Sequence, residues 1–144
     1  MAGTARPQLR IEHACRRLGR GEVVSRCLRL LAGGGVDDPE FLVALGGMAA
    51  VHLLDAGVPP EQAYWLRVWG ARGLLWAGPG DDAGVLRAAL ADDAWRVREM
   101  TCKVLARHRL GDLLEDVAQL ESDPVARVRS AASRAAACII AAEA

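Results

Sequence analysis

The sequence predicts an all-α fold, an α–α superhelix (solenoid) of antiparallel helical hairpins. Apolar residues recur at helical spacing between glycine and proline stops, and no alternating β-branched runs compete with that pattern. The segment that starts at Asp92 returns 31 residues later, at Asp123, with an acidic residue, a valine and an arginine in register. A weaker third copy starts near Pro59. A fixed period over three copies is typical of stacked helical repeats.

Length and composition favour one soluble domain over residues 1–144. A chain of 144 residues can bury a core without disulfides or metals. The net charge is zero, but residues 1–34 have a surplus of five positive charges and residues 35–144 a surplus of five negative ones. The basic end is either a set of solvated helix faces or a contact surface for an anionic partner. Lysine occurs once, at Lys103, and such a preference for arginine indicates a bacterial, high-GC coding bias.

The first half of the chain predicts two hairpins. A basic hairpin spans residues 7–32, and the glycine run at 33–35 that follows it is the candidate boundary in the chain. A first repeat spans 37–77 and opens with an acidic N-cap followed by a proline. Its first helix is expected to continue to about Ala56. The two glycines at 46–47 lie inside that helix, where a kink or a closely packed neighbour would explain them.

The second half predicts two more hairpins, over 81–109 and 112–142, which brings the total to eight helices in four hairpins. Short turns make successive helices antiparallel neighbours. The last helix is apolar on all sides over 135–142, whereas a terminal repeat needs a polar outer face to stay soluble. Either a two-fold homodimer covers this helix, or the amino-terminal hairpins fold back towards it.

The sequence predicts a cytoplasmic protein without a membrane span, metal or cofactor. No segment reaches the roughly 18 consecutive apolar residues that a membrane span needs. The four cysteines lack CxxC spacing and follow no secretory leader, which indicates a reducing compartment. The three histidines are isolated from other potential ligands, and no phosphate loop or nucleophile motif is present. The sequence therefore offers no catalytic residue, and whether the protein is an enzyme stays open.

The best-matched copies resemble a known repeat. Asp123-Pro124, Val128-Arg129 and the alanine pairs at 131–132 and 135–136 are similar to the consensus of HEAT-type repeats, in particular to the short HEAT-like units of bilin-lyase-related proteins. The resemblance covers 81–142 well, 39–77 in part and 8–32 in topology only. In that family the acidic residue of the turn and a later arginine form ladders between neighbouring repeats. The resemblance thus assigns a structural ladder to Asp92, Arg98, Asp123 and Arg129.

Helical spacing separates the packed side of each second helix from a strip roughly 110° away around the helix. The strip and its neighbourhood contain Trp65, Arg72, Trp76, Arg96, Glu99, Lys103, Arg107, Arg127 and Arg134. Because second helices line the concave surface of HEAT-like solenoids, the resemblance places these residues in a groove. A basic groove with tryptophans suits an oxyanion-bearing partner. Alternatively, Arg96 or Lys103 pairs with Glu99 one turn away, and the tryptophans cover a helix junction.

Two functions follow from these observations. The first is a protein–protein interaction scaffold or adaptor, whose basic groove binds a partner with an acidic surface. The alternative is nucleic-acid binding or repair, because Trp95, Arg96, Glu99 and Lys103 loosely resemble the basic, tryptophan-bearing face of HEAT-like alkylpurine DNA glycosylases. The neutral net charge favours the first function.

Overall fold

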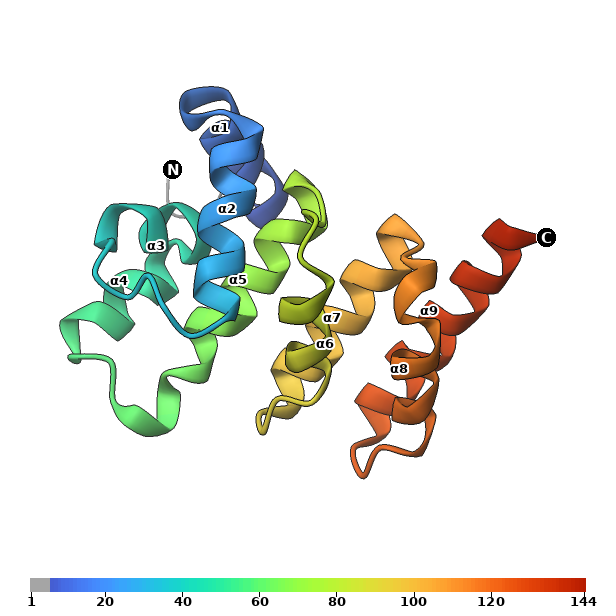
Figure 1. Cartoon of the computed structure of the whole chain (residues 1–144). Coiled ribbons are helices and arrows are strands. Elements are labelled where there is room, and N and C mark those ends of the chain that lie inside the picture. Colours follow the sequence, from blue (N-terminus) through green and yellow to red (C-terminus); the bar gives the residue numbers. More distant parts are fainter. Residues whose placement is uncertain (1–5) are drawn as a thin grey trace. The chain divides into compact units, whose positions relative to one another are not determined.

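The computed structural model describes residues 6–144, and this part of the chain is helical and contains no β-strand (Figure 1). The α-helices are α1 (Pro7–Leu18), α2 (Arg20–Leu31), α3 (Pro39–Gly46), α4 (Met48–Asp55), α5 (Tyr64–Ala77), α6 (Ala83–Leu90), α7 (Trp95–His108), α8 (Leu114–Gln119) and α9 (Ala126–Glu143). Three short 3₁₀ helices join them: η2 (Pro60–Gln62), η3 (Gly111–Leu113) and η4 (Leu120–Ser122). The all-α prediction is confirmed. None of the described helices is long and apolar enough to cross a membrane.

The chain divides into two compact units, which we call the N-terminal and C-terminal units. The first ends at Gly80 and the second begins at Asp81. The division thus follows directly after the Gly-Pro-Gly segment at 78–80. The glycine run at 33–35, which was the candidate boundary, lies inside the N-terminal unit. In that run Gly33 and Gly35 adopt positive φ values, so the glycines serve a tight turn between α2 and α3.

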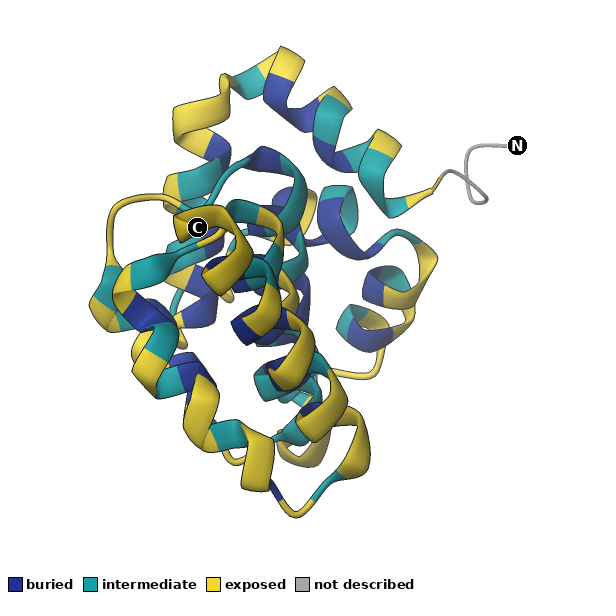
Figure 2. Ribbon diagram, turned by 90° about the vertical axis from the view of Figure 1, so that its right-hand side faces the viewer, coloured by how far each residue is buried: buried dark blue, intermediate teal, exposed yellow. Residues whose placement is uncertain are grey.

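The core of the N-terminal unit is centred on α2 and α5, which pack against each other most extensively. Two glycines of α5 make this approach possible. A Cβ at Gly70 would lie 2.9 Å from the carbonyl oxygen of Cys27, and a Cβ at Gly73 would meet the sulfur of the same cysteine. Helices α1 and α3 also pack on α5, and each of these helices contains buried residues, which Figure 2 colours dark blue. The tryptophan-rich α5 is therefore the central helix of this unit.

The predicted helix through residue 56 is wrong at its centre, because Gly47 separates α3 from α4. Gly47 has φ +62°, which ends α3 at Gly46 and lets α4 restart at Met48. Gly46 is also needed, since a Cβ there would lie 2.9 Å from the indole of Trp69. The chain therefore has nine α-helices in residues 6–144 where eight were predicted, and α3 and α4 pack on each other.

The C-terminal unit consists of α6 packed on α7, α8 packed on α9, and α7 packed on α9. The second helix of each repeat begins after the acidic residue that opens the repeat. Asp92 and Asp123 lie three residues before α7 and α9, and each accepts a hydrogen bond from the backbone N–H two residues on, at 2.8 and 2.9 Å. They therefore form Asx turns before the helices and do not occupy the first helical turn. The first half of the predicted hairpin over 112–142 consists of three short helices, η3, α8 and η4.

The apolar end of α9 is mostly covered within its own unit or consists of small residues. Ala132, Ala135, Ala136 and Ile139 are buried, and Ile140 is the large apolar side chain that stays exposed there. The homodimer through this helix remains a prediction.

Candidate functional site

The residues of the predicted strip are divided between the two units. Trp65, Arg72 and Trp76 belong to α5 of the N-terminal unit. The others belong to the C-terminal unit: Arg96, Glu99, Lys103 and Arg107 on α7, and Arg127 and Arg134 on α9. Two candidate sites result, one in each unit.

In the C-terminal unit, Trp95 is the centre of a cluster that joins α7 to α9. The guanidinium carbon of Arg96 lies 4.5 Å from the centroid of the indole ring, and that of Arg127 lies 5.1 Å from it. Both distances are within the range of cation–π contacts. The ring thus orients two arginines, one from each helix, on one surface.

Glu99 adds a carboxylate to this cluster. Its side chain is only 11% exposed and accepts a hydrogen bond of 3.0 Å from Nε of Arg127, whose own side chain is 65% exposed. The contact joins α7 to α9 and was not among the pairings considered from the sequence, which covered only the same helix. We call Trp95, Arg96, Glu99 and Arg127 the Trp95 cluster.

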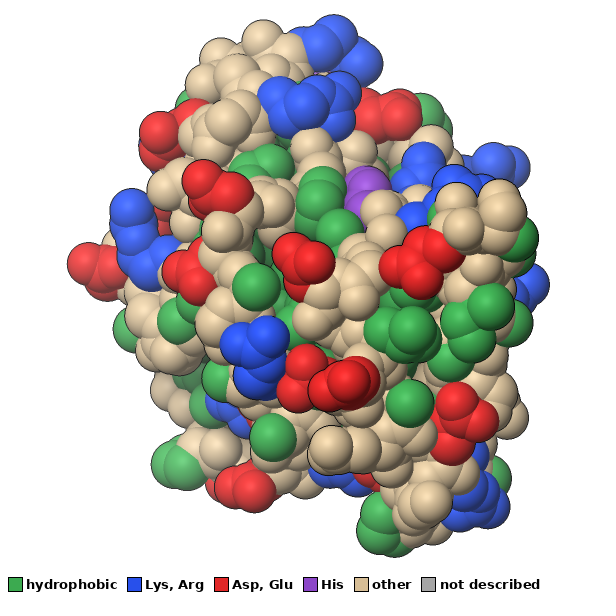
Figure 3. All heavy atoms as spheres, turned by 45° about the vertical axis from the view of Figure 1, so that its right-hand side comes forward, with side chains coloured by type: hydrophobic (Ala, Val, Ile, Leu, Met, Phe, Trp, Pro, Cys, Tyr) green, Lys and Arg blue, Asp and Glu red, His purple; other side chains and the backbone are tan. Residues whose placement is uncertain are grey.

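The second helices of the C-terminal unit are strongly basic. Together α7 and α9 contain seven arginine or lysine residues against two glutamates, Glu99 and Glu143. Lys103, Arg107, Arg127 and Arg134 are exposed. The segments outside these two helices contain nine of the unit's aspartates and glutamates. On the face that Figure 3 presents, acidic and basic side chains are intermixed, so the basic character belongs to two helices and not to the whole surface.

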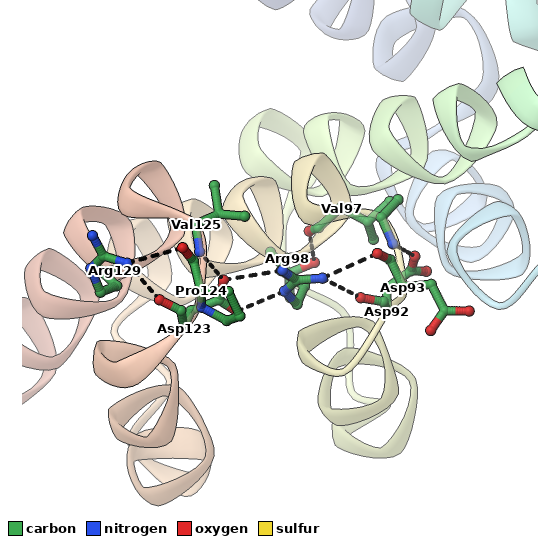
Figure 4. A network of polar contacts seen from close by, with 10 residues as sticks. Asp92, Asp93, Val97, Arg98, Asp123, Pro124, Val125 and Arg129 are labelled. Carbon is green, nitrogen blue, oxygen red and sulfur yellow. Dashed lines mark hydrogen bonds and ion pairs between the residues drawn. The ribbon is translucent and has the colours of Figure 1, made fainter.

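A ladder of arginines and aspartates connects the repeat starts (Figure 4). Arg98 donates two hydrogen bonds to the carboxylate of Asp123, from Nε at 2.8 Å and Nη2 at 3.1 Å. Its Nη1 donates to the carbonyl oxygens of Asp92 and Asp93 at 2.8 and 3.2 Å. Arg129 repeats the second part of this pattern on the carbonyls of Asp123 and Pro124. All four ladder residues named by the resemblance are thus in one network.

The ladder is nearly buried at its centre. The side chain of Asp123 is 4% exposed and that of Arg98 is 14% exposed. The hydrogen bonds from Arg98 lower the pKa of Asp123, burial opposes this shift, and the N–H of Val125 adds to it. An internally satisfied pair of this kind stabilises the turn between repeats and offers no group to a ligand.

In the N-terminal unit, a pocket of about 550 Å³ lies among α1, α3, α4, η2 and α5. Its lining comprises Arg10, Gly46, Ala49, His52, Leu53, Gln62, Trp65, Trp69 and Arg72. Trp65 stacks on Trp69 with ring centroids 6.4 Å apart. Arg10 and Arg72 both donate from Nη2 to one acceptor, the carbonyl oxygen of Leu45, at 3.3 and 3.0 Å. We call this cavity the Arg10–Arg72 pocket.

The pocket contains only part of the predicted strip on α5. Trp65 and Arg72 line it, whereas Trp76 does not, and the backbone carbonyl of Trp76 accepts a hydrogen bond from Arg20 at 3.2 Å. The sequence placed Trp69 on the packed side of α5, and nothing in it linked Arg10 to this site. The pair of glycines at 46–47 was the available signal, because a helix break there creates the concave surface.

Cysteine, histidine and acidic side chains do not cluster in the described part of the chain, and two of the cysteines have strongly raised pKa values. No group of three or more histidine, cysteine or acidic side chains in residues 6–144 could hold a metal ion. Burial raises the pKa values of Cys27 and Cys102 to about 12, so these thiols stay protonated.

Searches of protein-family models, of curated proteins and of solved structures find no match to this chain. The HEAT-like resemblance consequently rests on the residues quoted above. Function has to be inferred from the geometry of the two sites.

Proposed function

We propose that the protein is an interaction scaffold of the HEAT-like solenoid type, which binds an acidic segment of a partner protein on α7 and α9. One observation supports this most strongly: two packed helices contain seven cationic side chains and two glutamates, and five of the cations, Arg129 among them, are exposed. Exposed guanidinium and ammonium groups attract carboxylates, and arginine can bind them with two parallel hydrogen bonds.

The Trp95 cluster supplies an anchor for such a partner. Tryptophan and arginine are the residues that most often dominate binding energy at protein interfaces. The indole of Trp95 holds Arg96 and Arg127 in place, which reduces the conformational entropy that these side chains lose on binding. We therefore place the centre of the interface at this cluster.

Charge also favours a protein over a nucleic acid. A phosphate backbone presents a uniform line of negative charge, and Glu99 lies among the cations of α7 and α9 as a fixed negative group. A protein segment can oppose Glu99 with a neutral or basic side chain. The net charge of zero adds no long-range attraction for a polyanion.

The test is a binding measurement with two matched double variants. The tagged full chain is used to isolate a partner, which is identified by mass spectrometry, expressed and titrated by calorimetry. We expect Lys103→Glu with Arg134→Glu to weaken the complex by roughly tenfold or more, because like charges then face the acidic segment. The control, Arg16→Glu with Arg29→Glu, reverses two exposed charges on α1 and α2 and should leave the affinity unchanged.

Two results would contradict the proposal. An unchanged affinity in the Lys103 and Arg134 variant would exclude this surface. Binding of the wild-type chain to duplex DNA at about 50 mM salt, falling steeply as salt increases, would favour the nucleic-acid alternative.

A further inference from the structure

The Arg10–Arg72 pocket contains positive charge but no carboxylate. Its lining includes two arginines and one histidine, and neither aspartate nor glutamate is among the residues that form it. Its volume of about 550 Å³ is in the range of small-molecule sites, and two tryptophans form part of its wall. The pocket thus combines an apolar surface with convergent hydrogen-bond donors.

Arg72 shares its hydrogen-bond acceptor, the carbonyl oxygen of Leu45, with Arg10. Leu45 is in the last turn of α3, and its carbonyl oxygen is part of the negative end of the helix dipole. That end is equivalent to roughly half an elementary charge, which is less than the full positive charge of the Arg72 guanidinium. Capping of α3 therefore offsets the charge of Arg72 only in part.

Arg72 also has a hydrogen-bond donor without an acceptor among residues 6–144. Its Nε is buried and has no hydrogen-bond partner in the described part of the chain. Burial lowers the pKa of Arg72, and the neighbouring charge of Arg10 lowers it further. No carboxylate contributes to this shift. A bound anion would supply both the acceptor and the negative charge that Arg72 lacks.

The helix break at Gly47 makes room for the arginine pair. A Cβ at Gly47 would lie 3.0 Å from the guanidinium carbon of Arg10, which is tighter than an ordinary contact, so the glycine lets this side chain lie close against the backbone. Gly46 similarly admits the indole of Trp69. The same two residues thus bring a charged group and an aromatic wall into one cavity.

We propose that the Arg10–Arg72 pocket binds an oxyanion, a carboxylate or phosphate, on a small molecule whose flat ring lies against Trp65. The oxyanion accepts hydrogen bonds from Arg72 and Arg10, and the ring extends the stack that Trp65 and Trp69 begin. The site lies within the N-terminal unit, so it is independent of the interface proposed on α7 and α9.

The test uses four probes on the full chain: benzoate, phenyl phosphate, inorganic phosphate and the neutral benzamide. Side-chain NMR follows Nε–H of Arg72 and the indole N–H of Trp65. We expect benzoate or phenyl phosphate to shift both signals with a dissociation constant of about 1 mM or lower, as small ligands of this size allow. Inorganic phosphate should bind more weakly, and benzamide should not shift Arg72. The stronger of the two ring-bearing anions identifies carboxylate or phosphate as the preferred group.

Variants separate a binding site from a structural cap. Arg72→Gln should weaken the preferred probe by about tenfold or more, since a hydrogen bond to a charged group is lost, whereas Arg16→Gln, an exposed control on α1, should have no effect. Ala49→Phe, which fills the pocket from α4, should abolish binding even if Arg72→Gln fails to fold. Absence of any shift with all four probes, or equal binding by wild type and Ala49→Phe, would overturn the proposal.

Discussion

The arginine clusters of the two units differ in what their guanidinium groups meet. In the C-terminal unit, two arginines meet nearly buried carboxylates: Arg98 pairs with Asp123, and Arg127 pairs with Glu99. In the N-terminal unit, Arg10 and Arg72 meet on a backbone carbonyl in a pocket without an acidic residue. The packing differs too, because glycines bring α2 and α5 together.

This difference separates stabilising arginines from arginines that can bind a ligand. An arginine whose N–H donors all find acceptors within the fold contributes to stability and to the specificity of packing. One that is half-buried beside another cation costs stability, and such a cost is typical of binding sites. The Arg98–Asp123 ladder of the repeated half is thus structural, whereas the Arg10–Arg72 pocket of the irregular half contains an arginine without a carboxylate.

The largest effect is expected from removing the centre of the ladder. Asp123→Ala leaves Arg98 without its carboxylate and Val125 N–H without its acceptor. Breaking a nearly buried pair costs about 3 kcal/mol, which urea denaturation will measure. Hydrogen exchange should show faster opening in residues 81–144 and little change in residues 6–80, if the two units are as distinct as their contacts indicate.

A matched control comes from another pair in the same unit. Arg87 and Asp116 lie 3.2 Å apart with side chains 53% and 30% exposed. Asp116→Ala should therefore cost less than about 1 kcal/mol, as exposed ion pairs do. Equal losses in the two alanine variants would mean that burial of the Asp123 pair has no special role.

A smaller effect of the same sign is expected in the N-terminal unit from Gly70→Ala. The added Cβ would press on the carbonyl oxygen of Cys27, a backbone atom that cannot rotate away. Overpacking costs about 1–3 kcal/mol, and better helix propensity returns up to about 1 kcal/mol. Thermal unfolding should show a lower midpoint for this variant.

The control glycine lies in the opposing helix of the same pair. Gly21 is at the exposed start of α2, and a Cβ there would meet nothing within 4 Å. Gly21→Ala should leave stability unchanged or increase it by up to about 1 kcal/mol. A loss at Gly21 as large as at Gly70 would argue against close α2–α5 packing as the cause.

Sequence reasoning predicted the features that depend on local spacing. Apolar periodicity and stop residues identified the all-α class, and the repeat period located the turns that start at Asp92 and Asp123. It did not predict that these aspartates precede α7 and α9 by three residues, because an Asx turn and an N-cap use the same residue type. The sequence also predicted α3 and α4 as one helix, because a pair of glycines is compatible both with a kinked helix and with a break between two helices.

The candidate sites depend on contacts between distant segments, which spacing alone does not give. The strip calculated around each second helix could not predict that Arg127 of α9 reaches Glu99 of α7. Likewise, Arg10 enters the pocket from α1, 35 residues before Leu45. The packing of the helices decides which strips meet. The periodic pattern therefore could not predict that Arg10 lines the same pocket as Arg72.

The smallest expected effect is a pH dependence of stability in the C-terminal unit, which Asp123 produces. Because Arg98 lowers the pKa of Asp123 in the folded state, the unfolded chain takes up the proton at higher pH. The stabilisation is therefore complete above about pH 4 and is lost as the pH falls through the folded-state pKa of Asp123. Asp123→Asn removes this charge but nearly keeps its shape. The difference in free energy of unfolding between wild type and Asp123→Asn should then narrow below about pH 4, whereas a constant difference down to about pH 2 would show that the ladder acts through hydrogen-bond geometry alone.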